Sequence, residues 1–127
     1  MVESKSEVPE AGLDTELIAG VRSLSENERK QYQKLSVSVQ DTFIDILGQN
    51  LQSLNGVVEN EEFQSIVGAV AIGITFLIGD LENDPTISQK IITLLYTKVQ
   101  VLQMDFVEKF RTGSLAFMRP PEGSKLN

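Results

Sequence analysis

An uncharged stretch of seventeen residues, FQSIVGAVAIGITFLIG at positions 63–79, constrains the fold of this chain most strongly. Its length suits a buried helix but falls short of the ~20 apolar residues that cross the hydrocarbon core of a membrane. Its flanks, ENEE and DLEND, are acidic and lack the lysine or arginine that orients a membrane segment. Because a helix that is apolar all round is usually enclosed by amphipathic ones, we expect this stretch to form the buried centre of a bundle.

Composition excludes most enzyme chemistry. The chain has 127 residues, a formal net charge of −7, and no cysteine, histidine or tryptophan. Without cysteine it has no disulfides, thiolate nucleophiles or typical zinc sites, and without histidine it lacks the commonest general base and metal ligand. The acidic segment DLENDP departs from a calcium-binding loop, because Pro85 stands where that loop requires glycine. We therefore expect no enzymatic activity, no cofactor and no metal.

The charge balance also bears on partners and location. An acidic chain lacks the basic surface that binds nucleic acid or anionic lipid, so neither is expected as a partner. The first residues, MVESKSEVPEAG, contain three glutamates and no apolar core of a signal peptide. The expected location is the cytoplasm, with another protein as the partner.

Capping signals predict where the first two helices begin. A short helix is expected from Asp14 to about Leu24, with Asp14 as its N-cap. Ser25 and Glu28 have the spacing of a capping box, which predicts the start of a long helix over about residues 26–54. The Asn55–Gly56 pair is expected to end that helix, because glycine readily adopts the left-handed conformation of a C-cap.

Two further long helices are expected. Asn60 is a candidate N-cap for the helix that contains the uncharged stretch, which should stop near residues 79–83. Asp84 as a cap and Pro85 at the first helical position predict the start of the last helix, which should run to about Arg111. Its predicted inner stripe consists of Ile91, Leu95, Val99, Leu102, Phe106 and Phe110.

These elements predict an all-α fold: a single-domain helical bundle of about four helices, one short and three long, with a central all-apolar helix. The bundle domain is expected over residues 13–118, because the flanking segments are polar and contain proline and glycine. Residues 1–12 are interpreted as a disordered N-terminal arm and residues 119–127 as a flexible C-terminal tail.

Small residues follow one side of the apolar helix. Ser65, Ala69 and Gly73 are spaced by four, so they lie along one face, and small side chains allow another backbone to approach closely. One interpretation is a tight helix crossing inside the domain. The other is the seam of a homodimer.

A second candidate surface is a flank of the last helix, where charged and apolar residues alternate. The residues concerned are Leu94, Lys98, Val101, Asp105 and Lys109. Such a mixture is typical of a boundary with water, and the alternative is the edge of a partner-binding groove. Asp105 and Lys109 are four apart and are expected to form an ion pair.

The sequence leaves three functions open. The first is a non-enzymatic protein–protein interaction module, such as a small acidic adaptor, inhibitor or regulator. The second is a carrier of an apolar ligand, which predicts a cavity beside Gly68, Gly73 or Gly79, where side chains are missing. The third is a membrane-active bundle that exposes residues 63–79.

Overall fold

The computed structural model describes residues 8–54 and 58–113. They form four helices: α1 (Val8–Arg22), α2 (Glu26–Gln52), α3 (Asn60–Leu81) and α4 (Gln89–Arg111). The predicted all-α fold, with one short and three long helices packed together, is confirmed. The predicted helix end at Asn55–Gly56 and the predicted tail at residues 119–127 lie outside the described residues.

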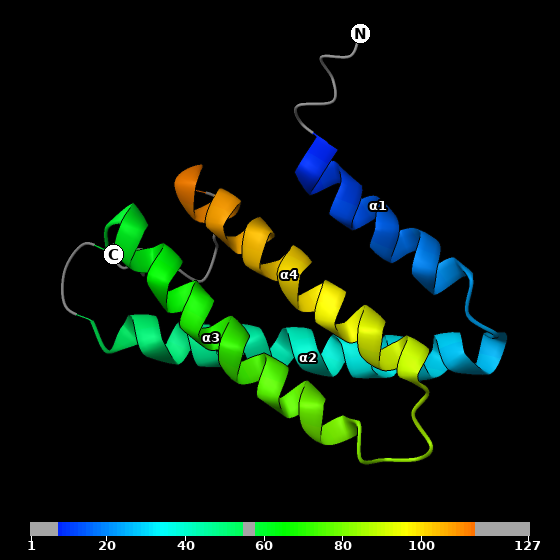
Figure 1. Cartoon of the computed structure of the whole chain (residues 1–127). Helices are drawn as coiled ribbons and strands as arrows, with labels where there is room; N and C mark the ends of the chain where they lie inside the picture. Colours follow the sequence, from blue (N-terminus) through cyan, green and yellow to red (C-terminus); the bar gives the residue numbers. More distant parts are fainter. Residues whose placement is uncertain (1–7, 55–57, 114–127) are drawn as a thin grey trace, which may run out of the picture.

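α4 occupies the middle of the fold. Figure 1 shows α1, α4 and α3 side by side, with α2 crossing behind them, and α4 contacts each of the other three helices. α3 and α4 are antiparallel neighbours: the rings of Phe63 and Phe110 stack with centroids 4.0 Å apart at one end. At the other end the Tyr96 hydroxyl donates a hydrogen bond to Glu82 at 3.1 Å. α1, α4 and α3 thus form one layer, and the apolar helix α3 lies at its edge.

The core lies between α2 and the layer of three helices. Phe43 of α2 packs on Phe106 of α4, with ring centroids 5.2 Å apart, and the Phe43 side chain is fully buried. The predicted inner stripe of α4 is confirmed at five positions, Ile91, Leu95, Val99, Leu102 and Phe106, which are all buried. The sixth, Phe110, is half-buried and covers Phe63.

The corner between α1 and α2 is held by two capping arrangements. The predicted capping box is confirmed: the Glu28 amide donates to the Ser25 hydroxyl at 3.2 Å, and the Ser25 amide donates to the Glu28 carboxylate at 3.0 Å. The Arg29 guanidinium donates to the carbonyls of Arg22 at 3.1 Å and Leu24 at 3.0 Å. A cation there satisfies carbonyls at the end of α1 that have no partner within the helix.

Three helix starts differ from the predictions. α1 begins at Val8, so residues 8–12, which were assigned to a disordered arm, are helical. Pro9 lies in the first turn, where its missing N–H has no helical partner to lose. α3 begins one residue early, with Glu59 as its N-cap in place of Asn60.

α4 begins later than predicted, with Ser88 as its N-cap. The Ser88 hydroxyl accepts a hydrogen bond from the Ile91 amide at 3.3 Å. Asp84 does not cap the helix, because its carboxylate accepts from the amide and the hydroxyl of Thr86, at 2.9 and 2.7 Å. This local turn around Pro85 competes with helix formation and delays the start of α4.

Two helical glycines have opposite surroundings. A Cβ atom added at Gly20 would overlap Cδ2 of Leu94, so α1 approaches α4 closely at this point. A Cβ atom added at Gly73 would meet no atom of another described residue within 4 Å. The absence of a side chain is therefore used for packing at Gly20, whereas at Gly73 no contact within the described chain requires it.

We expect the Gly73→Ala substitution to raise the free energy of unfolding by up to about 1 kcal/mol, because alanine has the higher helix propensity and meets no neighbour. Gly20→Ala makes the same change of propensity but forces Leu94 to move. Because the end of the Leu94 side chain must shift from its present position, we expect Gly20→Ala to be less stable than Gly73→Ala by about 0.5–1 kcal/mol. Urea unfolding followed by circular dichroism measures both, and equal gains in the two variants would show that Leu94 yields to a Cβ atom at position 20 without cost.

Candidate docking surface

α3 is buried on one side only. Its buried side chains are Phe63, Val67, Val70, Ala71, Ile74 and Ile78. In the most apolar window of this helix, 28% of the residues are buried. The prediction that the uncharged stretch forms the buried centre of the bundle is therefore corrected: α2 and α4 cover one side of α3, and no described element covers the other.

The opposite side of α3 carries large apolar side chains in contact with solvent. Phe76 is 72% exposed, Ile72 is 60% exposed and Leu77 is 49% exposed. We call this side the outer face of α3 and define it by six exposed residues: Ser65, Ala69, Ile72, Gly73, Phe76 and Leu77. Single exposed apolar residues are common on proteins, but a contiguous group along one helix is a candidate interaction surface.

The stripe of small residues belongs to this outer face. Ser65, Ala69 and Gly73 are all exposed, and among the described residues Gly73 has no neighbour within 4 Å of the position that a Cβ atom would occupy. The interpretation of the stripe as a tight crossing inside the domain is therefore wrong. The homodimer seam stays a prediction.

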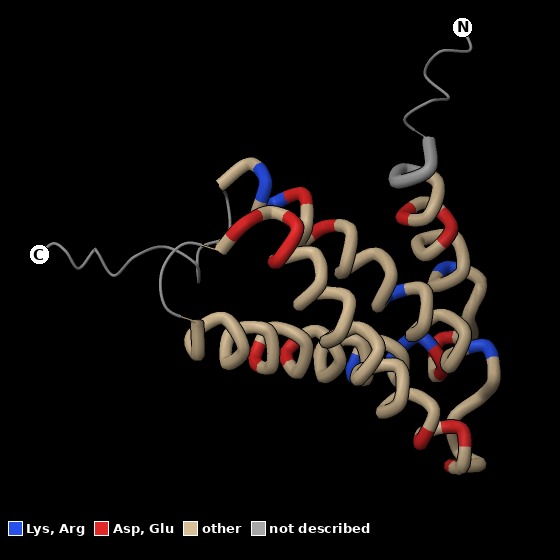
Figure 2. The backbone as a smooth tube through the Cα atoms, turned by 60° about the vertical axis from the view of Figure 1, so that its left-hand side comes forward, with Lys and Arg blue, Asp and Glu red and all other residues tan. Residues whose placement is uncertain are grey.

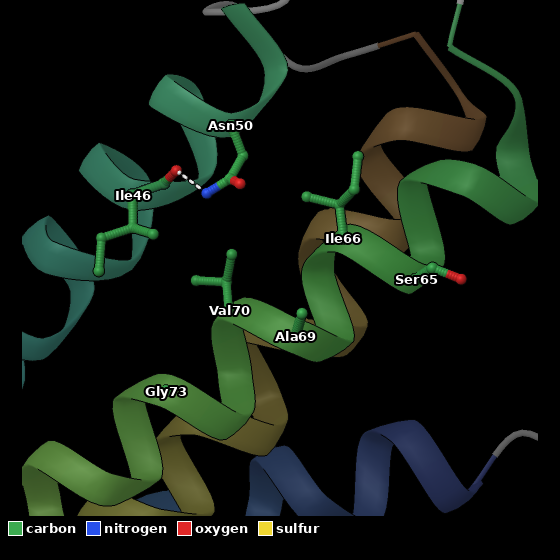
Figure 3. A pocket seen from close by; sticks show the side chains of 7 residues that line it. All are labelled: Ile46, Asn50, Ser65, Ile66, Ala69, Val70 and Gly73. Carbon is green, nitrogen blue, oxygen red and sulfur yellow. Dashed lines mark hydrogen bonds between the residues drawn. The ribbon is translucent and has the colours of Figure 1, made fainter. Parts of the chain in front are cut away.

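A groove runs beside the outer face, between α2 and α3. It has a volume of about 410 Å³, and its lining residues are Ile46, Asn50, Ser65, Ile66, Ala69, Val70 and Gly73. Figure 3 shows Ile66 and Val70 pointing towards α2, while the Ser65 hydroxyl points away from it. The Asn50 amide donates to the Ile46 carbonyl at 2.8 Å, which leaves the groove walls mainly apolar. The groove therefore adds a mainly apolar recess beside the outer face.

The groove bears on the prediction that the chain carries an apolar ligand in a cavity beside one of its glycines. Of the three glycines beside which a cavity was expected, Gly73 lines the groove. The other two adjoin side chains of α4: a Cβ atom at Gly68 would lie 3.8 Å from the Gln103 amide nitrogen, and one at Gly79 would lie 3.6 Å from the Tyr96 hydroxyl. Because four lining residues, Asn50, Ser65, Ala69 and Gly73, are exposed, a ligand in the groove would remain in contact with water.

Acidic residues mark both ends of the outer face. Residues 59–84 contain six acidic side chains and no basic one, and none of the charges falls within 63–79. Glu62 and Asp80 are 18 positions apart, which is about five turns, so they lie on the same side of α3 and about 27 Å apart. Figure 2 shows this arrangement, with acidic residues at the two ends of α3 and an uncharged middle.

Hydrogen bonds organise the acidic end that follows α3. Glu82 accepts from the Tyr96 hydroxyl, and burial together with this bond raises the pKa of Tyr96 above its usual value. The hydrogen bonds from the Thr86 hydroxyl and amide lower the pKa of Asp84. Both carboxylates are exposed, so this end of α3 presents negative charge to solvent at neutral pH.

The predicted surface on α4 is partly used within the chain. Leu94 is half-buried against Gly20 of α1, and Val101 packs against the core. Lys98 is half-buried. Asp105 and Lys109 form the expected ion pair, with 3.1 Å between the carboxylate oxygen and Nζ and with both side chains about half exposed. The structure thus brings these residues together on one flank, whose role in partner binding stays a prediction.

The acidic side chains of the described helices are dispersed. Residues 8–54 and 58–113 contain no group of three acidic side chains placed to hold a metal ion. Asp41 and Asp45, four positions apart on α2, are both exposed. In the same part of the chain, no buried side-chain nitrogen or oxygen lacks a hydrogen-bond partner. α3 is the one described helix that is long and apolar enough to cross a membrane, with a mean hydropathy of 1.7.

The comparisons with known proteins give no relative: no protein-family model, curated protein or solved structure matches this chain.

The sequence did not predict Ile72, Phe76 and Leu77 as surface residues, because the whole uncharged stretch was expected in the core. The available signal was the position of the charges. Glu62 and Asp80 lie on the same side of the helix as Ala69 and Gly73, and carboxylates at both ends of one side mark it as facing water.

Proposed function

We propose that this chain is a non-enzymatic protein-binding module that docks a partner protein on the outer face of α3. The observation that carries the proposal is the exposure of Ile72, Phe76 and Leu77 within a helix that has no charge from residue 63 to residue 79. Leaving these side chains in water costs free energy that a partner recovers by covering them, at about 25 cal/mol per Å² of apolar surface.

The groove between α2 and α3 supports the same proposal. Interfaces draw most of their affinity from a few large side chains that enter desolvated recesses. Phe76 supplies such a side chain from this molecule, and the groove, with its mainly apolar walls, offers a recess to a side chain of the partner. An anchor and an adjoining recess suit a helix laid along α3, because helices bind grooves through residues at three- and four-residue spacing.

Site-specific photocrosslinking tests the proposal. A photoreactive phenylalanine analogue is placed at Ile72 in the full chain, and a matched control carries it at Ala19, an exposed residue of α1, which lies on the far side of α4. In extract of the cells that produce the chain, we expect a discrete protein adduct from position 72 that is absent from position 19. The Phe76→Ser substitution should remove it, because it deletes the largest exposed side chain beside position 72.

Three results would contradict the proposal. An adduct of twice the chain mass would identify a second copy as the occupant of the outer face. An adduct with lipid would favour the membrane-active alternative. Identical patterns from positions 72 and 19 would show that the outer face has no specific partner.

A further inference from the structure

We propose that the partner of the outer face is a basic amphipathic helix with cationic side chains near both ends of its apolar stripe. This inference rests on the proposed function and adds the chemistry of the partner. It is carried by the juxtaposition of an uncharged apolar face with carboxylates at both of its ends.

The charges at the two ends of α3 specify the partner because all of them are negative. Glu61 and Glu62 lie in the first turn of α3, and Asp80 lies in its last turn. Nearby basic residues at the first of these ends are already paired, Arg111 with Glu108 and Lys109 with Asp105. A partner that covers the apolar middle therefore brings its own ends close to Glu62 and Asp80, which form no ion pair with a described basic residue. Opposite charges there speed association and fix the register, whereas like charges oppose binding.

The same argument disfavours a second copy of this chain. In an antiparallel pair of α3 helices, Glu62 of one copy would lie near Asp80 of the other. In a parallel pair, each acidic end would lie beside its equivalent. Because residues 59–84 contain no lysine or arginine, both arrangements place carboxylates against carboxylates. The same carboxylates would repel an anionic lipid surface.

The spacing gives the partner a length. Glu62 and Asp80 lie about 27 Å apart along α3, so the partner requires basic residues about 18 positions apart on the side of its apolar stripe. Between them, apolar residues at three- and four-residue spacing would cover Ile72 and Phe76 and enter the groove at Ile66. Such a helix has about five turns.

Fluorescence anisotropy with three labelled helical peptides tests the inference. The peptides share one apolar stripe and differ only at two end positions, which are lysine, glutamine or glutamate. We expect the lysine-ended peptide to bind the full chain at least about tenfold more tightly than the glutamate-ended one at low salt. This preference should shrink as salt rises, because the end charges are exposed and screened.

Two sets of variants locate the effect. Glu62→Gln with Asp80→Asn should abolish the preference for lysine ends. The matched control, Asp14→Asn with Glu16→Gln, removes the same charge from exposed positions on α1 and should leave most of the preference intact. Phe76→Ser should weaken binding of all three peptides by about 30-fold or more, as expected for a central anchor.

The outcomes separate this inference from the proposed function. Equal binding of the three peptides, still lost with Phe76→Ser, would overturn the basic partner and leave docking on the outer face intact. Failure of every peptide to bind would overturn the helical partner, while photocrosslinking at position 72 would still report on docking itself. Dimerisation of the full chain that Phe76→Ser abolishes, or Phe76-dependent binding to lipid vesicles, would replace the basic helix by a second copy or by a membrane.

Discussion

Phe63→Ala is expected to lower the free energy of unfolding by about 3–5 kcal/mol, whereas Phe76→Ala is expected to change it by less than about 0.5 kcal/mol. The two phenylalanines lie in the same apolar helix, thirteen positions apart. Phe63 is fully buried and stacks on Phe110 at 4.0 Å, so its loss leaves a cavity and an unsupported ring. Phe76 is 72% exposed and loses little packing on truncation.

The two substitutions distinguish the observed packing of α3, which is buried on one side, from the expectation that this helix is buried all round. A helix buried all round would lose several kcal/mol at either position, since both side chains would leave cavities. Urea unfolding of the two variants, followed by circular dichroism, measures the difference. A loss at Phe76 as large as that at Phe63 would show that the outer face is covered in the isolated chain and would contradict its assignment as a free docking surface.

Local signals in the sequence predicted the elements well. The capping box at Ser25 and Glu28 fixed the start of α2, because two reciprocal hydrogen bonds leave little freedom in where the helix begins. The inner stripe of α4 was also predictable, since apolar residues there alternate with polar ones at helical spacing. Asp84 misled because aspartate stabilises a local turn as readily as a helix cap, and here it binds Thr86.

The packing of α3 could not be predicted in the same way. Periodicity identifies a buried side only where apolar and polar residues differ around the helix, and residues 63–79 are uncharged on every side. Which side meets α2 and α4 then depends on how side chains such as Phe63 and Phe110 fit together. Apolar character alone also misleads in α2, where Val37 is 59% exposed.

The exposure of the outer face was missed for this reason, although the positions of the charges would have indicated it. The Ser65, Ala69 and Gly73 stripe was recognised, but small residues fit a tight crossing inside the domain as well as a surface. Glu62 and Asp80 distinguish the two, because burying that side of α3 would bring carboxylates out of water. The charged residues at the ends of an apolar helix therefore indicate which of its sides faces water, whereas the uncharged middle does not.

The most direct test of the outer face is thiol labelling, which this chain allows cleanly because it contains no cysteine. Single cysteines are introduced at Ile72, which is 60% exposed, and at Val67, which is fully buried on the opposite side of α3. We measure the rate at which each folded variant reacts with a thiol reagent, relative to its rate in urea. The buried cysteine reacts only after the helix opens, which costs several kcal/mol in a core.

We expect the cysteine at position 72 to react almost as fast in the folded chain as in urea. The cysteine at position 67 should react at least about 100-fold more slowly in the folded chain than in urea. Protection of both cysteines would contradict an uncovered outer face. Protection at position 72 that disappears on dilution would then assign the cover to a second copy, and protection independent of concentration would assign it to the chain itself.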